Sequence, residues 1–420
     1  MKTFLIIVLF FLLGSILTIH FNVFSVKDKI YKNYPNLNIR QYIFKKEPVF
    51  NRLSNDYNVK FLPETELIKL QFNKKKIKFK KNYYSDNLSS ASIAYKKWGS
   101  FFIDLHKNNL IITDYRGNFY ISQKIENLTK DESPLETKNI ISNLEDNLRV
   151  FDTLISENRI YITYTKKVNE CKKIYLSYAQ MNFTKLEFIN LFESNKCNAQ
   201  SSPGRIQLYK TEEKKGLLLS ISSGGYNKPS VASQDKNLID GKIILINPLD
   251  KKFSIFSIGH RVIQGLFSEN ELILATEHGP RGGDEINLIQ EKNNYGWPIS
   301  SYGEKYNFDY QQDPFYKKSH KKYGFIEPIY SYIPAIGISE LIRLPNEFSK
   351  FLNNVFIISS LYGRSIFLTK FSENFKKVIF TEKIFLNERI RDIKYFSKKQ
   401  FILLALEENG QLGLLTKQTR

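Results

Sequence analysis

The amino-acid sequence predicts an all-β protein, a six-bladed β-propeller preceded by an N-terminal hydrophobic segment. Three observations support this fold class. The chain contains many short apolar runs rich in Ile, Leu, Phe, Tyr and Thr, with clusters of Asn, Gly, Asp and Lys between them. The runs are too short for helices and have the composition of strands. The same arrangement recurs about every 50 residues, a period typical of propeller blades.

The repeating unit is a pair of apolar runs joined by a turn. Six pairs occur, at residues 110–114 with 118–122, 160–164 with 173–178, 217–222 with 242–246, 272–277 with 285–289, 355–360 with 365–370, and 401–407 with 411–415. One more strand candidate precedes each pair, at 101–105, 150–155, 205–209, 262–267, 341–344 and 390–396. Two β-sandwiches, the competing architecture, would not require the same hairpin six times. We therefore predict the propeller at residues 96–418.

The N-terminus has the character of an export signal. Lys2 precedes an uncharged stretch at residues 4–19, and the apolar character continues to Val26. This order predicts a signal peptide or a signal anchor at residues 1–26, and residues 4–24 are long enough to cross a bilayer. Residues 27–95 are expected to form a stalk and the first strands. We expect a periplasmic protein that is either released or tethered to the inner membrane by its N-terminal segment.

Composition limits the classes of partner. Hydrophobic residues make up 42% of the 420 residues, which excludes a disordered chain. The net charge is +20, but the lysines are scattered along the sequence, so we predict no nucleic-acid partner and expect attraction of small anions. Cys171 and Cys197 are predicted to form a disulfide in an oxidising compartment, and this interpretation is favoured over metal binding.

One loop is the strongest candidate for a binding site. Residues 277–285 read EHGPRGGDE, and NYGWP at 294–298 and SYG at 301–303 follow. Glycine and charge are too dense here for a solvated hairpin tip, and the loop is too polar for a core. The alternative is an elaborate β-turn in which glycines supply positive φ and the acids cap the backbone.

These motifs resemble the soluble glucose/sorbosone dehydrogenase family, the PQQ-dependent aldose sugar dehydrogenases. Further segments resemble the family in the same order, namely DGKI at 240–243, GHR at 259–261, QGL at 264–266 and RIRD at 389–392. The likeness covers roughly residues 95 to 415. It implies a six-bladed propeller that oxidises an aldose or a related alcohol with PQQ and Ca²⁺.

The resemblance also implies roles for individual residues. PQQ is a planar quinone with three carboxylates, and arginines at 261, 389 and 391 are suited to clamp them, so Arg261, Arg389 and Arg391 are predicted cofactor ligands. The backbone carbonyls of Gly279 and Pro280 are predicted to hold the calcium ion.

Four positions depart from the family pattern. Ser201 stands in place of the histidine base, Ser223 in place of its aspartate partner, Val262 in place of an asparagine, and Tyr362 in place of a cofactor-contacting lysine. Because serine is not a base near neutral pH without a partner, these changes reduce the expected acid-base catalysis by roughly two to four orders of magnitude.

Three further hypotheses follow from these departures. His278 or His260 takes over as the base, or a Ser-His-Asp hydrolase is formed by Ser201 or Ser223 with His278 and Asp284. In the third, the chain is a catalytically lapsed propeller that only binds a saccharide or a protein partner.

Overall fold

The computed structural model describes residues 72–77, 100–122, 125–128, 135–197, 201–224, 231–305, 316–345, 348, 353–408 and 410–417. The chain divides into two units, and every described residue lies in the second, Tyr57–Arg420. The predicted signal or anchor at 1–26, and most of the predicted stalk at 27–95, therefore lie outside the described residues. Among the residues that are described, no helix is long and apolar enough to cross a membrane.

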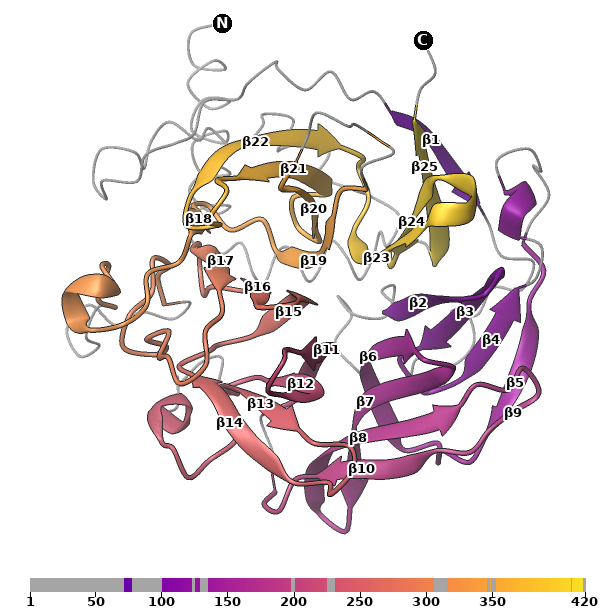
Figure 1. The fold of residues 1–420 in the computed structure, drawn as a ribbon, viewed down its shortest axis with the longest axis horizontal. Helices are drawn as coiled ribbons and strands as arrows, with labels where there is room; N and C mark the ends of the chain where they lie inside the picture. Colours follow the sequence, from indigo (N-terminus) through magenta and orange to yellow (C-terminus); the bar gives the residue numbers. More distant parts are fainter. Residues whose placement is uncertain are drawn as a thin grey trace, which may run out of the picture. The chain divides into compact units, whose positions relative to one another are not determined.

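Six sheets, antiparallel except for one short parallel pair, stand around a common axis, which confirms the predicted six-bladed β-propeller (Figure 1). We number the sheets as blades 1 to 6 in chain order. The described residues contain no α-helix, and the 3-10 turns among them are η2 (Ile125–Asn127), η3 (Val231–Gln234), η4 (Lys321–Tyr323) and η5 (Ser397–Lys399).

Blades 1 to 3 occupy the first half of the described chain. Blade 1 contains β2 (Phe101–His106), β3 (Asn109–Asp114), β4 (Phe119–Ser122), β5 (Lys138–Ser142) and β9 (Lys185–Leu186). Blade 2 contains β6 (Leu148–Ser156), β7 (Arg159–Val168), β8 (Cys171–Gln180) and β10 (Ile189–Glu193). Blade 3 contains β11 (Pro203–Lys210), β12 (Lys215–Ile221), β13 (Lys242–Ile246) and β14 (Phe253–Ile258).

Blades 4 to 6 complete the ring. Blade 4 contains β15 (Ile263–Glu269), β16 (Leu272–Glu277), β17 (Asp284–Leu288) and β18 (Tyr330–Tyr332). Blade 5 contains β19 (Ile338–Arg343), β20 (Val355–Ser360), β21 (Ser365–Phe371) and β22 (Val378–Phe385). Blade 6 contains β23 (Ile390–Phe396), β24 (Phe401–Leu406), β25 (Gln411–Lys417) and β1 (Phe72–Ile77).

Blade 6 is closed by a strand from the start of the described chain. β1 pairs antiparallel with β25, with Phe72 opposite Lys417 and Ile77 opposite Leu412. Because β1 and β25 lie at opposite ends of the described chain, their pairing joins the two ends of the ring in one sheet (Figure 1). β1 falls within the stretch that the sequence assigned to a stalk and first strands.

The hydrophobic core lies between neighbouring blades. The middle strands of each blade are buried on both faces, as in β20 and β24, where every residue is buried. Continuous apolar runs are expected for such strands. One core cluster joins blade 6 to blade 1 and contains Phe101, Leu110, Phe401 and Leu412. The blades are thus held together by apolar contact along their faces.

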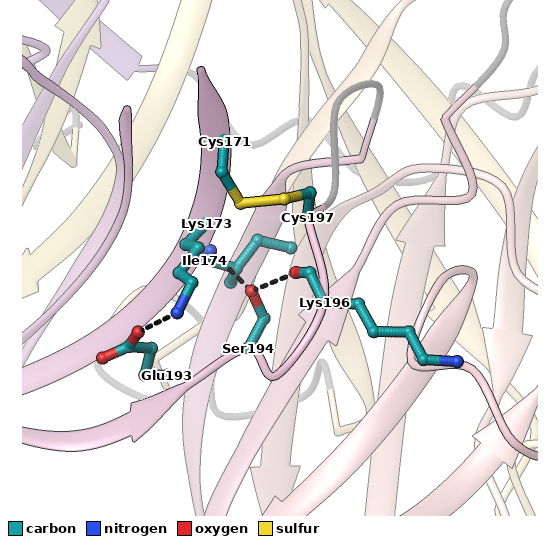
Figure 2. The surroundings of a disulfide bond; sticks show 7 residues. All are labelled: Cys171, Lys173, Ile174, Glu193, Ser194, Lys196 and Cys197. Carbon is teal, nitrogen blue, oxygen red and sulfur yellow. Dashed lines mark hydrogen bonds and ion pairs between the residues drawn. A yellow bond between two sulfur atoms is a disulfide. The ribbon is translucent and has the colours of Figure 1, made fainter. Parts of the chain in front are cut away.

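The predicted disulfide is present in blade 2. Cys171 at the start of β8 is bonded to Cys197 beyond β10, with 5.2 Å between their Cα atoms. Figure 2 shows Ser194 beside this bond, where its Oγ accepts a hydrogen bond from the Ile174 amide and donates one to the Lys196 carbonyl. The disulfide therefore fixes the segment that leads from β10 towards blade 3.

The strand directions place the candidate residues on one face. The innermost strands β2, β6, β11, β15, β19 and β23 begin at this face, which we call the site face (Figure 1). In antiparallel blades the second strand ends there and the third begins there. The β16–β17 loop and the residues just before β11, β15 and β23 therefore lie on the site face, as do those just after β12.

Candidate functional site

The glycine-rich loop between β16 and β17 is a tightly folded turn. Gly283 has a φ of +68°, and a Cβ on Gly279 would meet the Gly283 carbonyl oxygen at 2.1 Å. A side chain at either position is therefore excluded. The Asp284 carboxylate accepts hydrogen bonds from the amides of Gly279 (3.0 Å), Ile336 (3.0 Å) and Ile338 (2.9 Å). Asp284 thus ties the loop to the first strand of blade 5.

Four contacts, three hydrogen bonds and one cation–π contact, hold Arg261 next to this loop. Its amide donates to the Glu277 carboxylate, and its Nη1 donates to the His278 carbonyl at 2.9 Å. Its guanidinium lies over the Trp297 ring at 5.3 Å from the centroid. Its carbonyl accepts from the Ser223 amide at 2.8 Å. Arg261 is only 4% exposed, so its orientation is fixed before any ligand arrives.

Arg389 and Arg391 share one carboxylate. Glu407 accepts from Arg389 Nε and Nη2 on one oxygen and from Arg391 Nε on the other, at 2.8 to 3.1 Å. Arg391 Nη1 also donates to Gln264 Oε1 at 2.8 Å, which links blade 6 to blade 4. Burial raises the pKa of Glu407, but the two guanidinium groups lower it by more, so the pKa lies below its ordinary value.

His278 lies within the electrostatic reach of two of these arginines. Burial lowers the pKa of His278, and the positive charges of Arg261 and Arg391 lower it further, against the opposing effect of Asp284. Its Nε2 is buried and has no hydrogen-bond partner among the described residues. We call Arg261, Arg389 and Arg391 with Glu407 the rim arginine cluster. In it Arg389 and Arg391 share the Glu407 carboxylate, and Arg261 is oriented separately by His278 and Trp297.

A second charged group occupies the axis of the propeller. It contains Arg205 and Lys394 with Asp104, Asp152, Glu340 and Asp392, all on innermost strands, and we call it the axial ion cluster. Arg205 Nη1 lies 2.7 Å from Asp152 and 3.0 Å from Glu340. The other guanidinium nitrogens of Arg205 donate to the carbonyls of Gln264 and Arg391, so the two clusters are adjacent.

The axial ion cluster has more carboxylates than cations. Burial raises the pKa of Asp104 to about 7, against the lowering effect of Lys394. Burial also raises the pKa of Glu340 to about 7, against the lowering effect of Arg205. Burial lowers the pKa of Arg205, but Glu340, Asp152 and Asp392 raise it by more. The cluster therefore binds protons near neutral pH and keeps its cations charged.

Ser201 and Ser223, the two serines that differ from the family pattern, have different hydrogen-bond partners. Ser201 donates its hydroxyl proton to the Asp240 carboxylate. The Ser223 hydroxyl accepts from Trp297 Nε1 at 2.9 Å. Both serines are buried on the site face, and neither is bonded to His278, whose Nε2 lacks a partner among the described residues. The Ser-His-Asp arrangement of a hydrolase is therefore not formed.

With this geometry established, comparisons with known proteins identify the fold family. A family model described as glucose/sorbosone dehydrogenase matches residues 105–414. The chain belongs to the glucose/sorbosone dehydrogenase family. An uncharacterised protein of Synechocystis sp. is 30% identical over 284 residues, which are 61% of this chain and 67% of that protein.

Two further family comparisons concern aldose sugar dehydrogenases. The aldose sugar dehydrogenase YliI of Escherichia coli (strain K12) is 27% identical over 207 residues, which are 45% of this chain but only 54% of that relative. The PQQ-bound aldose sugar dehydrogenase of Streptomyces coelicolor has a TM-score of 0.56 at 14% identity, over 85% of this chain and 100% of that chain. At this identity the structural likeness shows the fold alone.

Within this family framework, the structure brings some predicted residues together and leaves others apart. Arg261, Arg389 and Arg391 gather at one end of the axis. Tyr362 follows β20 on the same face, and its side chain is 65% exposed. His260 is fully buried between Ser257 and Glu277, so both of its ring nitrogens are engaged. The catalytic, cofactor and metal roles of all these residues stay predictions.

Sequence reasoning missed several members of the site. Glu407 ends an ordinary apolar strand, and Gln264 and Trp297 lay inside quoted motifs without an assigned role. The signal that identifies them is contact with the arginines. Asp240 was also inside a quoted motif, but its pairing with Ser201 joins positions 39 residues apart.

Proposed function

We propose that this protein is a PQQ-dependent sugar dehydrogenase that oxidises an aldose or a related alcohol. Family membership supports the class of reaction. The observation that carries the proposal is the rim arginine cluster, in which Arg389 and Arg391 share the carboxylate of Glu407 and the charges of Arg391 and Arg261 both act on His278. Guanidinium groups bind carboxylates through paired, charge-assisted hydrogen bonds. The cluster therefore has positive charge available for an anionic cofactor.

The residues present fit such a cofactor. The side chains of Arg389 and Arg391 are 15% and 17% exposed, so they remain accessible while Glu407 holds them in place. His278, on which the charges of Arg261 and Arg391 both act, has a buried Nε2 without a hydrogen-bond partner among the described residues. When bound, PQQ supplies a quinone that accepts a hydride from the sugar carbon.

The chain's own residues supply orientation. Arg261 is fixed by the Trp297 ring and the His278 carbonyl, and Arg391 by Glu407 and Gln264. Fixed donors bind an anion without first losing side-chain freedom. We expect these arginines to set both the affinity and the orientation of the cofactor.

We also propose that a calcium ion binds at the carbonyls of Gly279 and Pro280. The described residues contain no group of three or more His, Cys, Asp and Glu side chains that could hold a metal. A site on the loop would therefore depend on backbone oxygens, which Ca²⁺ accepts as ligands. The rigid turn fixed by Asp284 supports this proposal because it holds both carbonyls in one conformation.

For location, we propose that the protein acts in the periplasm, released or tethered by residues 4–24. The order of Lys2 and the apolar stretch supports export. The disulfide between Cys171 and Cys197 is consistent with an oxidising compartment.

The proposed function is tested on the purified full chain. PQQ is titrated in the presence and absence of Ca²⁺ and followed by absorbance, and dye reduction is then measured with a panel of aldoses. We expect micromolar or tighter PQQ binding that depends on Ca²⁺, with turnover of at least one aldose. If the protein does not bind PQQ, the proposal is wrong.

A second candidate, a propeller that binds a saccharide without oxidising it, is favoured by the serines at 201 and 223. It predicts sugar binding by calorimetry without dye reduction, in the presence of bound PQQ or without it.

The role of the rim arginines in PQQ binding is tested by replacing them with alanine. Arg159→Ala serves as the control for these variants, because Arg159 begins β7 at the opposite end of the blades. It should leave PQQ binding unchanged.

A further inference from the structure

A cavity of about 770 Å³ lies at the end of the blades opposite the site face, where blade 4 meets blade 5. Its lining includes Glu269 at the end of β15, Arg343 at the end of β19, Asn354 just before β20 and Phe371 at the end of β21. The innermost strands begin at the site face, so these strand ends are remote from the glycine-rich loop. The volume is in the range of small-molecule sites. We call this cavity the distal cavity.

Arg343 contributes a guanidinium group whose orientation is already fixed. The guanidinium carbon lies 5.0 Å from the ring centroid of Phe356, 5.4 Å from that of Phe267 and 5.8 Å from that of Phe375. Its Nη2 lies 2.6 Å from the Glu269 carboxylate. Because aromatic rings and a carboxylate both constrain the guanidinium group, a ligand would meet its donors in one arrangement.

The aromatic rings that contact Arg343 belong to the core of two blades. Phe356 of blade 5 forms a T-shaped contact with Phe267 of blade 4, with 5.0 Å between the ring centroids. It forms a second T-shaped contact with Phe371 at 5.5 Å. Phe356 and Phe371 are fully buried, and edge-to-face pairs stabilise such packing. The distal cavity therefore rests on the packed core between blades 4 and 5.

Apolar side chains form part of the lining of the distal cavity. Leu344 and Phe371 are buried, whereas Ile379 on the outer strand β22 is 51% exposed. Covering an exposed isoleucine side chain removes apolar surface from water, which is favourable. A ligand with an apolar face would thus gain free energy from contact with Ile379.

Two carboxamides in the lining are available for hydrogen bonds. Asn353 accepts from Lys370 Nζ, and Asn354 accepts from the Phe371 amide at 2.9 Å, in both cases through the backbone carbonyl. Neither side-chain amide is hydrogen-bonded within the part of the chain that the structure describes. Each carboxamide supplies two donor hydrogens and one acceptor oxygen. The two asparagines therefore offer both kinds of partner to a ligand.

The charged groups of the lining balance one another. Arg343 and Lys370 are cations, and Glu269 and Glu373 are carboxylates. Arg343 is already paired with Glu269, so an anionic ligand would compete with Glu269 and a cationic ligand with Arg343. A wholly apolar ligand would bury polar groups without giving them partners. A neutral ligand that carries both hydroxyl groups and an apolar face has none of these costs.

We propose that the distal cavity is a binding site for a neutral saccharide of one or two sugar residues. Sugar hydroxyl groups both donate and accept, as the carboxamides of Asn353 and Asn354 and the Arg343–Glu269 pair require. The carbon–hydrogen surface of the sugar ring covers Ile379. This inference goes beyond the proposed function, because the distal cavity binds the sugar without oxidising it and needs neither PQQ nor Ca²⁺.

The proposal is tested on the purified full chain without PQQ or added Ca²⁺. Binding of methyl β-D-glucoside, cellobiose and maltose is detected by saturation-transfer NMR and quantified by calorimetry. We expect at least one of these neutral sugars to bind with millimolar or tighter affinity. Glucuronate and inorganic phosphate, tested in the same way, should bind more weakly than that sugar.

Two variants place the bound sugar in the distal cavity. Asn353 is exposed, so Asn353→Trp should fill part of the cavity and weaken sugar binding at least about 10-fold without changing the melting temperature. Arg343→Met keeps an apolar side chain against the rings but removes the donors, and it should weaken binding about 10-fold.

Matched controls separate this cavity from the site face. Asn147→Trp makes the same replacement at an exposed asparagine of blade 2 whose side chain makes one hydrogen bond of 3.5 Å, and it should leave sugar affinity unchanged. Arg391→Ala, on the site face, should also leave it unchanged. Loss of sugar binding in Arg391→Ala with retention in Asn353→Trp would place the sugar on the site face and overturn the proposal.

The remaining outcomes are equally decisive. If none of the three neutral sugars binds the wild type, or if the anions bind more tightly in a manner that Asn353→Trp abolishes, the distal cavity is not a neutral saccharide site. If Arg343→Met does not fold, Asn353→Trp decides by the same calorimetric measurement. Sugar binding that Asn353→Trp weakens supports the proposal even in a protein that does not bind PQQ, so the two proposals fail independently.

Discussion

The rim arginine cluster and the axial ion cluster are adjacent, since Arg205 of the axial cluster donates to the carbonyl of Arg391, yet the two clusters differ in burial and in charge. In the rim cluster Arg389 and Arg391 share one carboxylate, and both of these arginines remain partly exposed. In the axial cluster four carboxylates surround two cations, and Arg205 and the carboxylates are buried. Guanidinium groups at an accessible end favour the binding of an anionic ligand, whereas a buried ion network in the interior maintains the fold.

The largest expected effect comes from breaking the axial ion cluster. Arg205→Met removes the cation that faces Asp152, Glu340 and Asp392 and leaves them buried without it. Loss of one partner from a buried ion network costs about 3 to 5 kcal/mol of unfolding free energy. Urea unfolding measures the change, with Arg364→Ala as the control because its pair with Glu408 is partly exposed. A loss below about 1 kcal/mol would contradict a structural role for the cluster.

The rim arginine cluster should respond in the opposite way. Arg391→Ala leaves Glu407 paired with Arg389, so we expect a change of at most about 1 kcal/mol in unfolding free energy. PQQ affinity should fall about 30-fold, which corresponds to the loss of roughly 2 kcal/mol from a charge-assisted contact. Absorbance titration and urea unfolding on the same preparation provide both values. Unchanged affinity would remove Arg391 from the cofactor site.

The pH dependence of stability should reveal the axial carboxylates. Because burial raises the pKa of Asp104 to about 7, the folded state holds a proton that the unfolded chain releases near pH 4. Its contribution to stability is therefore present at low pH and lost as the pH rises to about 7. Asp104→Asn should reduce the decline in unfolding free energy between pH 4.5 and 8 by roughly 1 to 3 kcal/mol. Asp146→Asn is an exposed control, and an identical decline in both variants would show that Asp104 does not titrate in this range.

The smallest expected effect concerns salt. Partly exposed charges are screened within about 8 Å at physiological ionic strength, and buried pairs much less. PQQ affinity should therefore weaken a few-fold between 0.05 and 0.5 M NaCl, while the stability difference between wild type and Arg205→Met should barely change. Salt-independent PQQ binding would indicate that the rim arginines do not contact its carboxylates.

The sequence was sufficient for those parts of the fold in which burial is complete. Strands such as β16, β20 and β24 are continuous apolar runs and were located to within a residue. The fourth strands, such as β22, were not predicted, because their half-exposed residues mix charge with apolar side chains. β1 was not recognised because FNKKKI becomes a strand only by pairing with β25, more than 300 residues away.

In the candidate site, too, residues that belong to a local motif were predicted, and contacts between residues distant in sequence were not. Arg261, Arg389 and Arg391 were found from local motifs, and the structure brings them together. The shared partner Glu407 and the Ser201–Asp240 pair were not predicted. Each of these contacts joins residues that are far apart in the sequence, and the loop length between them does not indicate that they meet in the blade. Contacts between residues that are distant in sequence, even within one blade, require coordinates.

The pairing of β1 with β25 also determines the order in which this molecule can be completed. β25 is synthesised after all the other described strands, and only then can β1 pair with it. A ribosome adds about 5 to 20 residues per second, so β1 waits at least some 15 seconds for its partner to be made. Blades 1 to 5 can form during that interval, but the ring closes only after β25 has been made. Until then the propeller is an open arc with unpaired strand edges, a state in which chaperones would encounter it.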